Sequence, residues 1–143
     1  MIRVLIYGAL MWAVCGYALF RGGRAERIAA AGILVATYAT VLVLNPSVAM
    51  RFRHIEVPML LVDSTLFLVL LGISLRSEKY WPLWLTAMQA LTILTHFAPH
   101  VPHVIPWAYA NAAAMWAYPM LIILGVATRQ HHRQASAARY STG

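Results

Sequence analysis

Three of the six histidines lie close together in the stretch THFAPHVPHVIPW, residues 95–107, which carries no Asp, Glu, Lys or Arg. His96, His100 and His103 are four and three residues apart, so an unbroken helix would align them on one face, where imidazoles can ligate a metal ion. Two prolines interrupt such a helix, because proline lacks the backbone N–H that the helix needs. A turn would therefore have to bring the three rings together.

Two further candidate ligands for a metal ion, His54 and Glu56, are two residues apart in another polar stretch. The complete set matches no established metal motif such as H-E-x-x-H. Two interpretations stay open. One is a metal ion bound by His96, His100, His103, His54 and Glu56. The other is no cofactor, with interfacial histidines that hydrogen-bond water and lipid headgroups.

Asp63 is the only acidic residue inside the long apolar runs of the sequence. An ionisable side chain at membrane depth is costly unless it is paired. At a rise of 1.5 Å per residue, Asp63 lies roughly 9 Å inside the run that begins at Val57. Polar residues of the other apolar runs reach a similar depth, which predicts a polar layer inside a helical bundle. Its members are Asp63, Gln89, Thr92, His96, Asn111, Tyr38 and Tyr7.

This polar layer allows two interpretations. Hydrogen bonds between its members would fix the packing of the helices, as polar side chains do in membrane bundles. Alternatively, the layer would hold a proton, a cation or a small ligand that enters from the outer face. In a variant of the second interpretation, Asp63 and His96 are the acid and base of an intramembrane enzyme.

The composition requires an environment other than water. Of the 143 residues, 62% are hydrophobic and 10% are charged, and the mean hydropathy is +0.69. A soluble domain carries about 25% charged residues. A fold of this size has too little interior to bury so much apolar surface. The composition therefore predicts an all-α integral membrane protein whose partner is the lipid bilayer.

The net charge of +7 does not indicate nucleic-acid binding, because the basic residues are scattered singly rather than grouped on a basic run. The only cysteine, Cys15, excludes an internal disulfide and a cysteine-based zinc cluster. No phosphate loop, nucleophile elbow or CxxC motif is present.

Five segments are long and apolar enough for membrane spans, which need roughly 20 apolar residues each. They comprise residues 2–20, 28–44, 57–75, 81–98 and 107–128. Together they predict a polytopic transmembrane helical bundle over residues 1–128. A four-span variant, with one segment re-entrant, is the alternative. Residues 129–143 are polar, basic and rich in small side chains, which is typical of a flexible cytoplasmic tail.

Orientation follows from the distribution of lysine and arginine, which gather on the cytoplasmic side of membrane proteins. With the N-terminus outside, the cytoplasmic segments hold eight of the basic residues and the outer segments hold three, namely Arg3, Arg51 and Arg53. This distribution predicts an N-out, C-in topology. The abundance of alanine and arginine suits a bacterial inner-membrane protein from a GC-rich genome.

The size of the chain and its lack of catalytic motifs favour a non-enzymatic accessory or scaffold subunit of a membrane assembly, whose partners are other membrane subunits or a second copy. The alternative is a protein that binds or transports a small ligand, proton or cation at the Asp63 layer from the periplasmic face. The intramembrane enzyme is the third possibility. Only the last two require an opening to Asp63.

Overall fold

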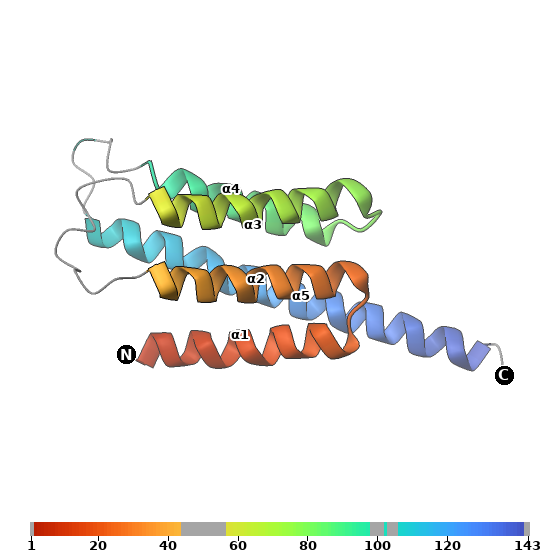
Figure 1. The fold of residues 1–143 in the computed structure, drawn as a ribbon. Coiled ribbons are helices and arrows are strands. Elements are labelled where there is room, and N and C mark those ends of the chain that lie inside the picture. Colours follow the sequence, from red (N-terminus) through yellow and green to blue (C-terminus); the bar gives the residue numbers. More distant parts are fainter. Residues whose placement is uncertain (1, 44–56, 98–101, 103–105, 142–143) are drawn as a thin grey trace.

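The computed structural model describes residues 2–43, 57–97, 102 and 106–141, and of residues 43, 106–110, 112 and 113 it describes the backbone only. This part of the chain is all-α and contains five helices (Figure 1). They are α1 (Ile2–Arg21), α2 (Arg24–Val43), α3 (Val57–Arg76), α4 (Trp81–Thr95) and α5 (Pro106–Ser141). The fold class is the expected one. At most helix ends, the observed and the expected boundaries differ by only a few residues.

A pair of glycines makes the turn between α1 and α2. The N–H of Gly22 donates to the carbonyl of Ala18 at 2.9 Å, and the N–H of Arg27 donates to the carbonyl of Gly23 at 3.0 Å. A Cβ on Gly22 would collide with that same carbonyl of Ala18. Only glycine avoids this collision. The glycine pair therefore allows the chain to reverse within two residues, so that α2 runs back along α1.

The turn between α3 and α4 is also short. The N–H of Ser77 continues the last turn of α3 by donating to Ile73, and the Ser77 hydroxyl accepts from the N–H of Lys79 at 3.2 Å. Pro82 lies in the first turn of α4, where a missing N–H leaves no hydrogen bond unmade. The two helices therefore form a second antiparallel hairpin.

Helix α4 is shorter than the segment 81–98 that the sequence predicted. It has 15 helical residues, and its last turn is tighter. There the backbone N–H of His96 donates to the carbonyl of Ile93 at 3.0 Å, and the backbone N–H of Phe97 donates to the carbonyl of Leu94 at 3.1 Å. Such i to i−3 bonds are common in a last helical turn. The proline at position 99 disfavours a helical conformation in the residue before it, which explains the early end.

Helix α5 continues far beyond residue 128, unlike the flexible tail that we expected for residues 129–143. It is helical to Ser141 and extends beyond the other helices (Figure 1). No glycine or proline occurs between residues 126 and 141, and alanine, arginine and glutamine there favour a helix. A contact of 3.3 Å between Arg21 and His132 joins this extension to the end of α1.

The five helices form a closed ring in chain order, because each contacts the next and α5 contacts α4, α1 and, to a smaller extent, α2. The hydrophobic core occupies the half of the ring nearest the α1–α2 turn. Its fully buried side chains come from the second halves of α1 and α3, the first halves of α2 and α4 and the middle of α5, and they include Cys15, Leu70, Leu85, Leu121 and Leu124. At the other end, where α1 begins, the ring is less densely filled.

The outer surface of the ring is apolar. Leu42, Leu68 and Leu75 are among the large hydrophobic side chains that are more than half exposed. Within the described residues, three helical segments are long and apolar enough to cross a membrane, namely Ile2–Arg21, Arg24–Leu42 and Val57–Arg76. Since lipid can cover such a surface and water cannot do so favourably, the structure indicates a membrane protein.

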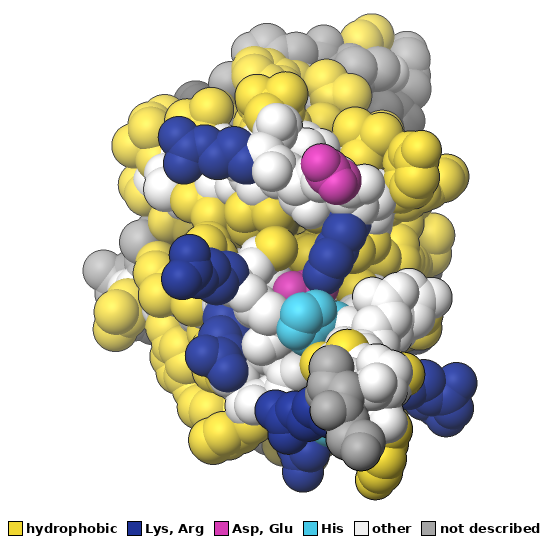
Figure 2. All heavy atoms as spheres, turned by 90° about the vertical axis from the view of Figure 1, so that its right-hand side faces the viewer, with side chains coloured by type: hydrophobic (Ala, Val, Ile, Leu, Met, Phe, Trp, Pro, Cys, Tyr) yellow, Lys and Arg dark blue, Asp and Glu magenta, His cyan; other side chains and the backbone are white. Residues whose placement is uncertain are grey.

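A buried ion pair lies at the end of the ring where α1 meets α2. The side chain of Glu26 is 1% exposed, and its Oε1 accepts from Lys79 Nζ at 2.7 Å. Lys79 Nζ also lies 3.4 Å from His131 Nδ1 on α5. We call these three residues the Glu26 cluster. Figure 2 shows this end of the molecule, where lysine and arginine side chains surround histidine and acidic ones. The cluster joins α2, the α3–α4 turn and the extension of α5.

We expect Lys79→Met to destabilise the fold, because Glu26 would keep a buried negative charge without its cation. The free energy of unfolding should fall by about 1–3 kcal/mol, which is the usual effect of losing one buried partner. Arg76→Met removes an exposed charge from the end of α3 and is the control. The free energy of unfolding of both variants is measured in mild detergent and compared with that of the unmodified protein. Equal stability of the two would show that the ion pair does not hold the helices.

Candidate functional site

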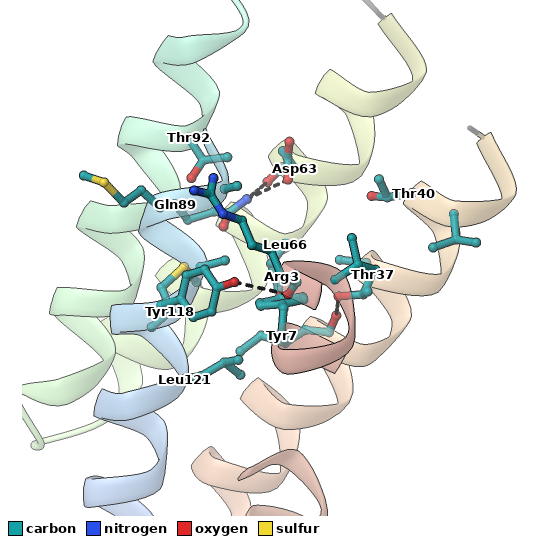
Figure 3. Close-up of a pocket in the computed structure, with 18 of the residues that line it drawn as sticks. Arg3, Tyr7, Thr37, Thr40, Asp63, Leu66, Gln89, Thr92, Tyr118 and Leu121 are labelled. Carbon is teal, nitrogen blue, oxygen red and sulfur yellow. Dashed lines mark hydrogen bonds between the residues drawn. The ribbon is translucent and has the colours of Figure 1, made fainter. Parts of the chain in front are cut away.

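A cavity of about 830 Å³ lies inside the ring at the end where α1 begins. All five helices contribute to its walls (Figure 3). The polar side chains around it are Arg3, Tyr7, Thr37, Thr40, Asp63, Gln89, Thr92, Asn111 and Tyr118. The remaining wall is apolar, with buried Ile33, Leu66, Met120 and Leu121 at the end nearest the core.

Small side chains explain why the cavity forms at this end. Ala36, Ala114 and Ala117 line it, together with two threonines of α2. In the opposite half of the ring, buried leucines take the equivalent places. Five helices around one axis leave a central space that only large side chains can fill, so the small side chains of α2 and α5 leave it open.

The carboxylate of Asp63 is held by two side chains of α4. Gln89 Nε2 donates to Asp63 Oδ1 at 3.0 Å and to the backbone carbonyl of Asp63 at 3.2 Å. His96 Nε2 lies 2.6 Å from Asp63 Oδ2, the distance of a strong hydrogen bond from a ring N–H to a carboxylate. Both carboxylate oxygens therefore have a donor. These two contacts, which we call the Asp63 clasp, join α3 to α4.

Arg3 brings a positive charge to the cavity from the first turn of α1. Its Nη1 donates to Asn111 Oδ1 at 3.3 Å, and its backbone carbonyl accepts from the hydroxyl of Tyr118 at 3.4 Å. The ring of Tyr118 meets that of Tyr7 edge to face, with centroids 5.6 Å apart. These contacts fix the first turn of α1 against α5.

The structure brings most of the predicted polar layer together. Asp63, Gln89, Thr92, Asn111 and Tyr7 line the cavity, and His96 reaches Asp63 from its edge. Tyr38 lies elsewhere. Its ring packs edge to face against Trp12, with centroids 6.1 Å apart, and it is 48% exposed. The neighbouring Thr37 lines the cavity instead, because one residue along a helix turns the side chain by about 100°.

Four polar members of the wall were not predicted, namely Arg3, Thr37, Thr40 and Tyr118. Arg3 entered the sequence argument only as one charge of the outer side, although it stands one turn before Tyr7 and therefore shares its face. That spacing was the available signal. Tyr118 follows Asn111 by seven residues, which again gives one helix face.

The metal hypothesis rests mainly on residues outside the described part of the chain. His54, Glu56, His100 and His103 all lie there, so the hypothesis stays a prediction. His96 is described, and its Nε2 faces Asp63. Among the described residues, no group of three or more histidine, cysteine, aspartate or glutamate side chains is close enough to hold a metal ion.

The polar groups of the cavity are held by other groups of the protein. Each oxygen of Asp63 accepts a hydrogen bond, so the carboxylate is oriented. The hydroxyl of Thr92, which lines the same cavity, donates to the carbonyl of Met88 in its own helix. An apolar end together with an oriented carboxylate and a guanidinium is typical of a ligand pocket.

Comparison with known proteins adds no relative, since no protein-family model, curated protein or solved structure matches the chain.

We expect Asp63→Leu to destabilise the fold and Asp63→Asn to be mild. Leucine removes the carboxylate that accepts from Gln89 and His96, so Gln89 keeps only the backbone carbonyl at position 63 and His96 loses its acceptor, which costs about 1–3 kcal/mol. Asparagine keeps an oxygen for Gln89, and a neutral imidazole can accept from its amide. Thermal unfolding in detergent or nanodiscs measures the stability of both variants. The control is Thr65→Leu, at an exposed position on the same helix. An Asp63→Leu protein as stable as this control would contradict the clasp.

Proposed function

We propose that the chain is a multi-pass protein of the bacterial inner membrane, with five spans and its N-terminus outside. The three apolar helices lie in one ring with α4 and α5, so a membrane around the first three also surrounds the other two. In this orientation the Glu26 cluster and the extension of α5 lie at the cytoplasmic side. The positive-inside tendency supports that side, because most lysines and arginines occur there. The cavity then lies near the periplasmic face.

Reporter fusions provide the test of this topology. Fusions after Arg27 and after Lys79 should give a cytoplasmic signal, whereas fusions near Arg53 and near His103 should give a periplasmic one. The expectation follows from the distribution of basic residues. A periplasmic signal from the Lys79 fusion would exclude the proposed arrangement of spans.

We propose that the protein binds a small, mainly apolar molecule with a polar head. One observation supports this function above all, namely the cavity of about 830 Å³ that all five helices line. Ligand pockets commonly measure roughly 300–1,000 Å³ and combine apolar walls with a few convergent polar groups. The buried leucines would contact the apolar part of the ligand, and the side with Arg3 and Asp63 would contact its head.

Access to the cavity also fits this proposal. Val4, Val41 and Met115 line it and are themselves more than half exposed, whereas Gln89 and Leu121 in the same wall are buried. The cavity thus has an open side and an enclosed side. A ligand can therefore enter from the outer leaflet or from the periplasm, and its apolar part can lie against the core.

The accessory or scaffold subunit remains the second candidate. It requires exposed helix faces that contact another chain, and the described helices have such faces. Lipid would cover the same faces equally well, so they do not favour a protein partner. The cavity is the feature that a purely structural subunit does not explain.

A pair of tryptophan substitutions on α2 tests ligand binding. Ala36 lines the cavity and Ala31 is exposed on the same helix, so Ala36→Trp should fill the cavity while Ala31→Trp leaves it open. Protein purified in native nanodiscs should carry a small molecule that native mass spectrometry detects. We expect the molecule to be lost from Ala36→Trp by about tenfold or more, corresponding to roughly 1.4 kcal/mol, and retained by Ala31→Trp.

Two results would contradict ligand binding. One is an unmodified protein that carries no molecule and takes up none of a set of added amphiphiles. The other is equal retention by the two tryptophan variants when both fold with similar thermal stability.

A further inference from the structure

The charges around the cavity are not balanced. The carboxylate of Asp63 accepts from the amide of Gln89 and from the ring of His96, so the protein itself supplies donors to both oxygens. These donors disperse the negative charge of the carboxylate. Asp63 therefore offers little attraction to a cationic ligand.

Arg3 is in the opposite situation. A guanidinium has five N–H donors in one plane, and Arg3 uses one of them on the neutral amide oxygen of Asn111, at the long distance of 3.3 Å. In the described part of the chain its side chain pairs with no carboxylate. Its backbone carbonyl is bound by Tyr118, which holds the residue in place while the guanidinium keeps spare donors at the cavity.

The cavity extends away from Arg3 into apolar surroundings. On α2 its wall runs from Val41 to Ile33, eight residues or roughly 12 Å at the usual helical rise. Leu66 and Leu121 enclose the far end and are buried (Figure 3). A ligand that satisfies both ends needs an anionic head and an apolar body.

Resting on the ligand binding proposed above, we propose that the ligand is a lipophilic carboxylic acid, bound as its anion with the carboxylate on Arg3 and the apolar chain toward Leu66 and Leu121. A planar guanidinium can bind a carboxylate through two parallel hydrogen bonds. A phospholipid phosphate shares the single negative charge, but its two acyl chains exceed what a cavity of about 830 Å³ encloses. The single-chain carboxylate is therefore the better match.

Three probes of equal chain length separate the head groups. Dodecanoate, dodecanol and dodecylammonium are offered to the protein in phosphatidylcholine nanodiscs, with empty nanodiscs to subtract partition into lipid. Equilibrium dialysis with radiolabelled probes gives each Kd. Dodecanoate should bind about 10- to 100-fold more tightly than dodecanol, the range expected when a charged hydrogen bond is gained. Dodecylammonium should bind no better than dodecanol.

Variants of Arg3 connect this preference to its guanidinium. Arg3→Gln should abolish the advantage of dodecanoate, whereas Arg3→Lys should retain part of it, because lysine keeps the charge but cannot bind in a bidentate manner. The matched control is Arg24→Gln, at an exposed arginine beside the opposite end of the bundle. It should bind all three probes like the unmodified protein. Thermal unfolding of each variant confirms that the fold is intact.

The outcomes distinguish this inference from the proposed function. Equal binding of the three probes, or a preference for dodecylammonium, overturns the carboxylate inference and leaves ligand binding supported, provided that Ala36→Trp weakens it. Loss of dodecanoate binding in nanodiscs that contain phosphatidylglycerol assigns the site to a lipid headgroup and also overturns it. Failure of every probe to bind, together with no change in Ala36→Trp, overturns ligand binding itself.

Discussion

Closure of five helices into one ring is the constraint on which the other features depend. A ring of five leaves a space along its axis that two or three packed helices would not have, and this space must be filled by side chains or by another molecule. Leucines from three helices and Cys15 fill it near the α1–α2 turn. Alanine and threonine face it near the start of α1, so the same ring is a packed core at one end and a cavity at the other.

The two carboxylates described inside the bundle are each bound by residues of the α3–α4 hairpin. Asp63 on α3 accepts from two side chains of α4, which ties this hairpin at its outer end. Glu26 on α2 accepts from Lys79 in the α3–α4 turn, which ties α2 to the same hairpin at the other end. In a surrounding as apolar as lipid, such polar contacts specify which helices are neighbours, because unpaired alternatives are costly. The position of the cavity between them follows from this arrangement.

The sequence predicted the helices well and the interior only in part. Apolar run length located the helix starts to within one residue, except that α2 begins four residues before its expected segment. Run length succeeds because it depends on local composition. The layer around Asp63 followed from depth alone, since residues at one level of a bundle can meet. Depth does not give rotation about the helix axis, however, and this is why Tyr38 was expected in the layer where Thr37 lies. The helical extension of α5 was missed because a polar composition was taken to indicate flexibility, although its residues are good helix formers.

Arg3 shows most clearly what a sequence argument lacks. In the sequence argument Arg3 is one positive charge near a terminus, which bears only on the orientation of the protein in the membrane. In the folded ring its side chain meets Asn111, 108 residues along the chain, and shares a cavity with Asp63. The two charged groups then differ in a way that their residue types do not reveal. Among the described residues, the carboxylate has donors at both oxygens, whereas the guanidinium has one long bond to a neutral amide. The head group that a ligand needs is thus set by how the protein has already satisfied each charge, and this can be read only once the neighbours of each charge are known.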